Sequence, residues 1–395
     1  MVIRRCSINP LTPIIVPRLM FCIGGSITVR SNIGVVSVIL VCMLLLVSCD
    51  QVGNNTEITE ITTEATDTEQ NRGINVIQTP PEEYIFKNED VYFLVTPKGL
   101  PNEGILFSDL SLERRGSHFG HAMVEYADGC ILAFYPNCNF DNRGHSGRGW
   151  MEYKRSTDYG KTWSDPIILE YSYNMFRDSE EKRSTMSEKA VRAPDGKIIL
   201  FNVVCDVETT ALWEPYYAPT YIVSEDGGES WSEARKLDIY RGRVYDAMVL
   251  GDRIYVLVKY ASSGAEDSGY RIYRSDDNGN TFDMIGKINF NRSGSYYGTL
   301  GVLDDGRFIV YVYNETDETK LEYATSENGG ISWSVPQMAT FAKKIRNPQL
   351  AKLENSYFMF GRSGSFGDNS GHIVMYASRD GINWDEGRYM RIKTK

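Results

Sequence analysis

Five apolar hairpins in this chain share one pattern, and the polar residues around them are the groups best suited to chemistry. When the hairpins are aligned by their turns, one position is occupied by His121, Glu188, Asp246, Gly298 and Asn347. Further polar or aromatic groups lie beside this position or at the far ends of the partner strands: Tyr135, Lys189, Tyr245, Lys259, Tyr297, Tyr313, Arg346 and Arg362. An ordinary core would be apolar at such positions. Imidazole and carboxyl groups transfer protons and cations hold anions, so this set predicts a functional site.

Each of these residues also has an ordinary structural interpretation. His121 would then be a hydrogen-bonded structural histidine, and Glu188 would form an ion pair with its neighbour Lys189. Arg346 would position a loop, and the tyrosines would be platforms on which sugars stack without any proton transfer. No spacing of Cys and His suggests a zinc site, so we expect no metal and no other cofactor.

One short phrase recurs five times and predicts the elements that position these residues. It reads STDYGKTW from Ser156, SEDGGESW from Ser224, SDDNGNTF from Ser275, SENGGISW from Ser326 and SRDGINW from Ser378. Asp or Asn accepts hydrogen bonds within its own turn, and Gly supplies the positive φ that such turns need. Each phrase lies between two strand-like runs and predicts a hairpin turn. With the apolar hairpin before it, each repeat of about 50 residues predicts one four-stranded antiparallel blade of an all-β propeller.

The repeated phrase resembles the Asp box of the sialidase (neuraminidase) superfamily, and the resemblance covers roughly Ser117 to Trp384. It implies a six-bladed β-propeller. Five blades can be counted in the sequence, and we expect residues 84–112 to supply the sixth blade or to close the ring. In this family the boxes lie on the outer rim, so we expect them to be structural.

The same resemblance implies a site with three arginines that clamp a carboxylate, an Asp acid and a Tyr–Glu nucleophile pair. The Phe-Arg-Ile-Pro motif that carries the first arginine is absent here, and Tyr297 and Tyr313 stand where the family has its Glu and its second arginine. Arg346 and Arg362 are the matching clamp residues, and the best match to the acid is Asp141. A sialidase-like glycosidase would use two carboxylates from the set Asp141, Glu188 and Asp246. A separation of about 5 Å predicts retention of configuration, and about 6.5–9.5 Å predicts inversion.

Two other functions fit the residues. A branch of these propellers contains polysaccharide lyases that act on uronates with His or Tyr, and His121, Tyr297, Arg346 and Lys189 would suit that chemistry, because the charge that spreads into the carboxylate needs stabilisation. The third hypothesis is a propeller that binds glycans without cleaving them. We favour a glycoside hydrolase that acts on glycans with acidic sugars.

The first 73 residues differ in character from the rest of the chain. Arginines precede an apolar run from Ile33 to Val47 that ends in Leu46-Val47-Ser48-Cys49, as is typical of a secretory signal. The LVSC ending resembles the bacterial lipobox, so residues 1–48 are predicted to be a lipoprotein signal peptide and Cys49 the lipidated residue. An ordinary signal peptide is the alternative. Residues 49–73, rich in Thr, Glu and Asn, predict a disordered tether, and residues 74–395 predict the propeller domain.

The charge and the leader limit the partners. A net charge of −10 argues against nucleic acid, which attracts basic surfaces. We expect a glycan or polysaccharide substrate, a monomer, and a membrane reached through the anchor at Cys49, on the periplasmic face or the cell surface. Among the cysteines after the anchor, Cys130 and Cys138 could pair, which would leave Cys205 alone.

Overall fold

The computed structural model describes residues 85–88, 91–95, 120–139, 148–177, 183–206, 217–260, 269–290, 295–364 and 372–393. Several sequence predictions fall outside these residues. They are the signal peptide at 1–48, the lipidation of Cys49, the tether at 49–73 and the catalytic assignment of Asp141.

The described residues form five sheets, and each contains the four antiparallel strands of one blade. Blade one contains β3 (Ala122–Ala127), β4 (Cys130–Asn139), β5 (Arg148–Ser156) and β6 (Ile167–Ile168). Blade two contains β7 (Arg183–Arg192), β8 (Ile198–Asp206), β9 (Thr220–Ser224) and β10 (Arg235–Lys236), and the helix α2 (Glu170–Arg177) precedes it. Blade three contains β11 (Gly242–Leu250), β12 (Arg253–Tyr260), β13 (Gly269–Ser275) and β14 (Asp283–Ile288). Blade four contains β15 (Ser295–Val302), β16 (Phe308–Asn314), β17 (Lys320–Ser326) and β18 (Gln337–Thr340).

Blade five is larger than the others, because a hairpin from the N-terminal side joins it. Its own strands are β19 (Arg346–Leu353), β20 (Ser356–Arg362), β21 (Ile373–Ser378) and β22 (Arg388–Lys393). The hairpin of β1 (Ile85–Asn88) and β2 (Val91–Val95) adds to the outer edge, where β2 pairs with β22 in parallel. The prediction of a propeller with four-stranded blades is therefore confirmed. In place of the expected sixth blade, the described part of residues 84–112 extends blade five.

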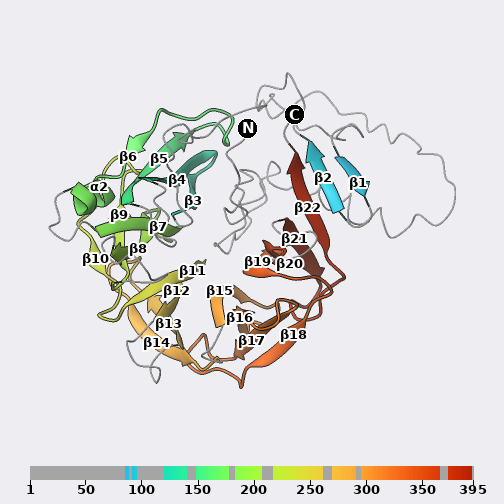
Figure 1. Cartoon of the computed structure of the whole chain (residues 1–395). Coiled ribbons are helices and arrows are strands. Elements are labelled where there is room, and N and C mark those ends of the chain that lie inside the picture. Colours follow the sequence, from blue (N-terminus) through green and yellow to red (C-terminus); the bar gives the residue numbers. More distant parts are fainter. Residues whose placement is uncertain are drawn as a thin grey trace, which may run out of the picture.

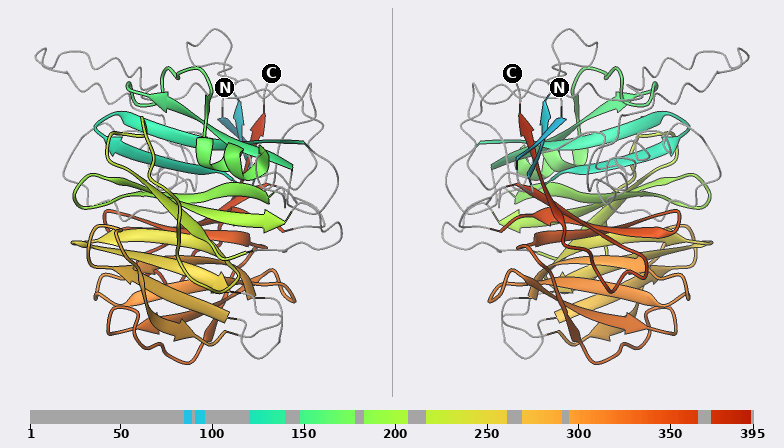
Figure 2. Two further views of the ribbon diagram at one scale, coloured as in Figure 1. Left: turned by 90° about the vertical axis from the view of Figure 1, so that its left-hand side faces the viewer. Right: turned by 90° about the vertical axis from the view of Figure 1, so that its right-hand side faces the viewer.

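The blades are arranged in a ring with their first strands innermost, as Figure 1 shows for β3, β7, β11, β15 and β19. Each of these strands contacts the next one in the series. Figure 2 shows the same sheets from two sides, with β2 beside β22. Apolar clusters fill the spaces between neighbouring blades, and side chains such as Leu132, Ile254 and Val310 are fully buried there. Alternating strand patterns place these apolar residues inward between the sheets.

The five repeated turns make the same hydrogen bonds. In the second copy the hydroxyl of Ser224 donates to Oδ1 of Asp226 (2.8 Å), and that carboxylate accepts from the backbone N–H of Ser230 (2.9 Å). The N–H of Gly228 donates to Ser224 Oγ (2.7 Å), which requires the positive φ of 86° that glycine adopts readily. The fourth copy keeps the pattern with Asn328 in place of Asp, as the sequence predicts, since its amide oxygen accepts from Ser332 N (2.9 Å).

No disulfide joins the three cysteines of the described region, which are Cys130, Cys138 and Cys205. The pairing of Cys130 with Cys138 is therefore not found, and Cys138 instead packs against Met186 within the core. Among the helices in the part of the chain that the structure describes, none has the length and apolar character needed to span a membrane.

Candidate functional site

Strand pairing defines which residues of the five inner strands are equivalent. The serine that opens each repeated turn pairs with one residue of the second strand: Ile131, Ile198, Ile254, Phe308 and Tyr357. The second-strand residue three positions later in the sequence pairs with the innermost strand of the same blade. Its partners there, which are the equivalent residues of the five inner strands, are Ala122, Lys189, Asp246, Thr299 and Gln349. In blades one, two and four each of these residues directly follows the one aligned from the sequence, so the relative register of those three blades was correct. The alignment is wrong by one residue in blade three, where Asp246 itself was aligned, and by one residue in blade five, where Gln349 lies two residues after Asn347.

The inner strands are irregular beside these residues. The register skips Glu188 in β7, Tyr245 in β11 and Tyr297 in β15, and in β19 it skips the two residues after Arg346. Such β-bulges re-aim side chains and are common beside active sites. Tyr297 has a φ of 51° and Asn347 a φ of 54°, a left-handed conformation that costs a residue other than glycine about 1–3 kcal/mol. Four of the five inner strands thus depart from regular geometry at the same level.

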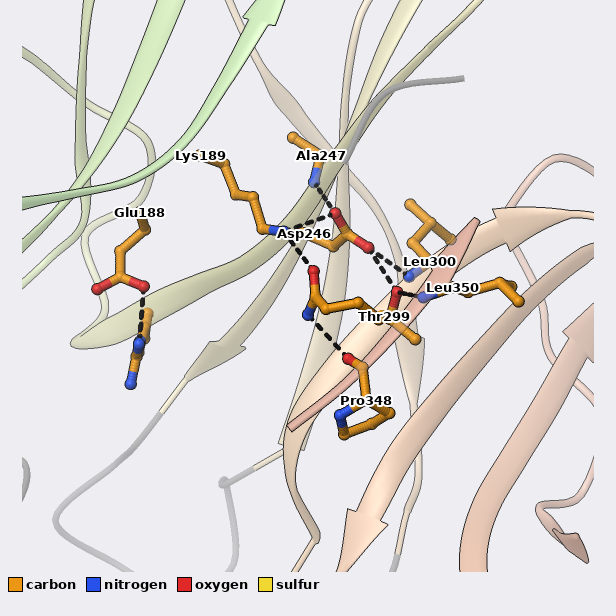
Figure 3. Close-up of polar contacts among 10 residues, drawn as sticks. Glu188, Lys189, Asp246, Ala247, Thr299, Leu300, Pro348 and Leu350 are labelled. Atoms are coloured by element: carbon orange, nitrogen blue, oxygen red, sulfur yellow. Dashed lines mark hydrogen bonds and ion pairs between the residues drawn. The ribbon is translucent and has the colours of Figure 1, made fainter. Parts of the chain in front are cut away.

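The equivalent residues of blades two to five are joined in a circuit of polar contacts, which we call the polar ring (Lys189, Asp246, Thr299 and Gln349). The circuit closes through the backbone of Leu350, the neighbour of Gln349. Lys189 Nζ lies 2.7 Å from Gln349 Oε1 and 3.4 Å from Asp246 Oδ1. The hydroxyl of Thr299 donates to Asp246 Oδ2 (2.8 Å) and accepts the backbone N–H of Leu350 (2.9 Å). Figure 3 shows Lys189 and Asp246 inside this network and Glu188 outside it. The ring connects blade two directly to blade five.

Burial and bonding give Asp246 and Lys189 structural roles in this arrangement. Asp246 is 2 % exposed, and its carboxylate also accepts the N–H groups of Ala247 and Leu300, both at 2.9 Å. Both of its oxygens are therefore occupied by donors, which does not suit a catalytic acid or nucleophile that must meet a substrate. Lys189 is directed at Asp246 and Gln349. The ion pair of Lys189 with Glu188 that the sequence suggested is replaced by this contact, and Glu188 has another partner.

Glu188 instead pairs with Arg243, which precedes the bulge of blade three. The Nε and Nη2 atoms of Arg243 both lie near Oε2 of Glu188, at 3.1 and 2.7 Å. The Glu188 side chain is only 9 % exposed, and its Oε1 has no hydrogen-bond partner among the described residues. A buried carboxylate oxygen without a donor is costly, and such groups are frequent at functional sites. Glu188 therefore has one oxygen held by a cation and one buried oxygen without a hydrogen-bond partner in the described region.

A row of rings and cations continues from this pair across blades three, four and five. The guanidinium of Arg243 lies 5.0 Å from the ring centre of Tyr245, and the rings of Tyr245 and Tyr297 are 5.9 Å apart. Tyr297 is 5.8 Å from Tyr313, and Arg346 lies over both rings at 5.6 and 5.2 Å. Cation–π contacts and edge-on ring pairs hold such a surface rigid. The sequence predictions of Tyr245, Tyr297, Tyr313 and Arg346 are thus brought together.

The blade-five end of this row concentrates positive charge. Arg346 and Arg362 are cross-strand partners, and like charges placed directly opposite each other are unfavourable. Burial lowers the pKa of Arg362, and the Arg346 cation lowers it further. Glu318 lies near two cations, Arg346 Nη1 at 4.0 Å and Lys344 Nζ at 3.8 Å. We call this group the cationic cluster (Lys344, Arg346, Arg362 and Glu318).

Tyr313 is tied to the cationic cluster through a hydrogen bond. Its hydroxyl donates to Glu318 Oε1 at 2.9 Å, and the residue is 2 % exposed. Burial raises the pKa of Tyr313 well above its usual value, although Arg346 acts in the opposite direction. Tyr313 therefore stays a protonated donor that holds Glu318 in place.

The remaining predicted residues lie apart from this row or at its margin. His121 is partly exposed and directly precedes β3, next to Ala122, the blade-one equivalent of Lys189. Lys259 is the cross-strand partner of Arg243 in blade three. Tyr135 is buried and donates to Glu152 (2.9 Å) inside blade one. Within the described ranges, no three His, Cys, Asp or Glu side chains gather as metal ligands would.

Sequence reasoning missed five residues that the structure places in or beside the site. They are Arg243, Thr299, Glu318, Lys344 and Gln349. Thr299 and Gln349 lie one and two residues after Gly298 and Asn347, the positions that the sequence alignment selected. Arg243 lies two residues before the bulged Tyr245. Its place near the start of an inner strand, like that of Arg346, could have marked it as a site residue. Glu318 follows the end of β16, and nothing in its local pattern distinguishes it from an ordinary turn residue.

The fold is that of a sialidase-like propeller. The chain resembles a microbial sialidase called Hz136, with a TM-score of 0.54 and 14% identity over 70% of this chain and 62% of that one. It also resembles a variant of the NanB sialidase from Streptococcus pneumoniae, with a TM-score of 0.53 and 15% identity over 73% and 63% of the two chains. This chain thus spans less than two thirds of either sialidase.

A protein of unknown function from Dyadobacter fermentans has a similar fold over 83% of its length, with a TM-score of 0.52 and 14% identity. No family model matches the chain, and no curated protein matches it. At these identities the likeness establishes the sialidase-like fold and leaves the activity to be argued from the site.

Proposed function

We propose that this chain is a glycoside hydrolase that acts on glycans with acidic sugars, and that the row from Glu188 to the cationic cluster is its substrate site. The observation that carries the proposal is the cross-strand pair Arg346 and Arg362, placed beside the rings of Tyr297 and Tyr313. Two guanidinium groups at one position suit a carboxylate, which arginine binds in a planar, bidentate manner. The partly exposed ring of Tyr297 beside the cations suits a sugar face. The fold shared with sialidases is consistent with this function.

Glu188 is the residue of this row that we assign to proton transfer. Its Oε2 is held by Arg243, and its Oε1 is buried without a hydrogen-bond donor, so a sugar hydroxyl or a water could donate a hydrogen bond to it. A general acid or base must lie within hydrogen-bond reach of the group that it serves. Asp141 stays a prediction for the second carboxylate. We assign Asp246 to the framework because its oxygens are occupied.

The experiment compares acidic glycans of two kinds, sialyllactose and oligogalacturonate, in three measurements. Hydrolysis releases reducing ends without a new double bond, lyase chemistry produces a new double bond that absorbs ultraviolet light, and a binding protein gives a calorimetric signal with no product. Hydrolysis of either glycan by the wild type supports the proposal. Lyase products would identify His121 and Tyr297 as the residues to test next and would overturn the hydrolase assignment.

Two substitutions test the assigned residues. Arg362→Gln should raise KM, or Kd, at least about tenfold, because a charged hydrogen bond contributes about 1.5–3 kcal/mol. Glu188→Gln should lower kcat by about 10²-fold or more and leave KM within a few-fold. The control is Arg307→Gln, which removes an exposed guanidinium paired with Asp305 at the rim of blade four. Equal effects of Arg362→Gln and the control would exclude the cationic cluster from substrate binding.

Export and membrane attachment through Cys49 are a separate part of the proposal, supported by the charged and apolar leader. A labelled fatty acid supplied to bacteria that express the full chain should be incorporated into the protein. Cys49→Ala should abolish the incorporation. Equal labelling of both proteins would refute lipidation at Cys49.

A further inference from the structure

Each member of the polar ring lies just beyond a distorted part of its own strand. Lys189 and Asp246 are the first residues back in register after the bulges at Glu188 and Tyr245. Gln349 is likewise the first residue back in register in β19. In β15 the first such residue is Gly298, and Thr299 directly follows it. The ring therefore fastens the inner strands at the level where the candidate site residues leave regular geometry.

The ring is also closed across the centre of the propeller. β7 and β19 face each other from blades two and five (Figure 1), and the contact of Lys189 with Gln349 joins them without passing through blades three and four. In the other direction the contacts run from Lys189 to Asp246, then to Thr299 and on to Leu350. The amide of Gln349 donates to Pro348 O (2.8 Å) and so holds the bulge that follows Arg346.

We propose that the polar ring is a positioning element, which holds Glu188 on blade two and the cationic cluster on blade five in one fixed arrangement. Lys189 is then a positioning residue and does not bind substrate. The identity of the two ends as a substrate site rests on the proposed function, whereas the fastening of the strands does not. A site whose ends come from separate blades needs such a device, because a misplacement of about 1 Å reduces catalysis by about 10²-fold.

The physical need for the ring is clearest at the strained residues. Tyr297 and Asn347 have positive φ values, and such conformations persist only where the surroundings impose them. The inner strands are also sheet edges, whose N–H groups find no further strand to bond. The N–H of Leu300 donates to Asp246 and that of Leu350 to Thr299, both at 2.9 Å. The ring side chains thus take the place of a neighbouring strand.

Hydrogen exchange of backbone amides tests this fastening without requiring any activity. Lys189→Met removes the ammonium group and keeps much of the side-chain length. The amides of Leu300 and Leu350, on blades four and five, should exchange at least about tenfold faster in this variant, because their acceptors lose the closed ring. The control is Lys197→Met, which removes a lysine from the hairpin turn of blade two, where it contacts Glu225 at 3.1 Å. It should leave both amides unchanged.

A second variant opens the ring from the opposite side. Gln349→Leu should speed exchange at Leu300 and Leu350 as Lys189→Met does, and the double variant should add little to either, since both remove the same contact. Faster exchange confined to blade two in Lys189→Met, or additive effects in the double variant, would overturn the proposed ring.

The catalytic consequence is measured on whichever acidic glycan the wild type cleaves. Lys189→Met should lower kcat at least about tenfold with KM changed less than about threefold, because the cationic cluster still binds the substrate while Glu188 is misplaced. A raised KM with unchanged kcat would show that Lys189 contacts substrate and would overturn the positioning role. If the wild type neither binds nor cleaves an acidic glycan, the proposed function fails, and the exchange experiment still decides whether the ring fastens the strands.

Discussion

Replacement of Asp246 by asparagine tests how much the polar ring contributes to the folded state. Asp246 is 2 % exposed and forms an ion pair with Lys189, and its two oxygens accept three hydrogen bonds, from Ala247, Thr299 and Leu300. An asparagine has one oxygen and one NH₂ group in place of two oxygens. Whichever way the amide turns, its NH₂ group faces a backbone N–H, either of Ala247 or of Leu300.

The expected magnitude follows from these contacts. Breaking a buried ion pair by removing one partner costs about 3–5 kcal/mol, and an unsatisfied buried donor costs about 1–3 kcal/mol. Because the two effects share the same atoms, we expect a loss of about 4 kcal/mol in the free energy of unfolding of Asp246→Asn. This is a large fraction of the roughly 5–15 kcal/mol that stabilises a typical protein.

Urea unfolding followed by circular dichroism measures this loss, with the dependence on urea concentration expected to be unchanged. The control is Asp276→Asn, because Asp276 also contacts two arginines, Arg253 at 2.8 Å and Arg274 at 2.7 Å, but its side chain is 47 % exposed. Exposed ion pairs contribute little, so the control should lose several times less stability. If both variants unfold at the same urea concentration, the reasoning that assigns the ring a structural role is refuted.

Two further predictions concern the repeated turns. The hydroxyl and N–H of Ser230 lower the pKa of Asp226 to about 2, so the stability that this carboxylate contributes is present above its unfolded pKa of about 3.9 and is lost as the pH falls toward 2. Asp226→Asn should therefore reduce the slope of unfolding free energy against pH between about 4 and 2, whereas Asn328→Asp in the fourth turn should increase it; unchanged slopes would contradict this. Gly228→Ala should cost at least about 2 kcal/mol, because the position has a φ of 86° and the new Cβ would lie 2.5 Å from Leu132 Cδ1. Gly251→Ala, with a φ of 63° and no atom within 4 Å, is the matched control, and equal thermal shifts would show that the clash is relieved.

The sequence alone determined the architecture of the propeller. The five copies of the turn phrase carry their own hydrogen-bonding groups within a few residues, so their structure is local and can be predicted from residue type. The apolar hairpins before them have strand periodicity, and together the two patterns give the blades and their order. The same patterns placed Tyr245, Tyr297, Tyr313, Arg346 and Arg362 near the inner strands, where the structure brings them together.

Tertiary structure decided which of the polar residues belong to a site and which belong to the framework. Bulges at Glu188 and Tyr245 re-aim side chains of the inner strands without any mark in the sequence. That is why Asp246 and Lys189, both expected at the site, are fastened to Thr299 and Gln349, while Glu188 turns to Arg243. The partners in these contacts come from different blades, up to 160 positions apart in the chain. No local pattern specifies such a contact, because it depends on how the sheets pack around the axis.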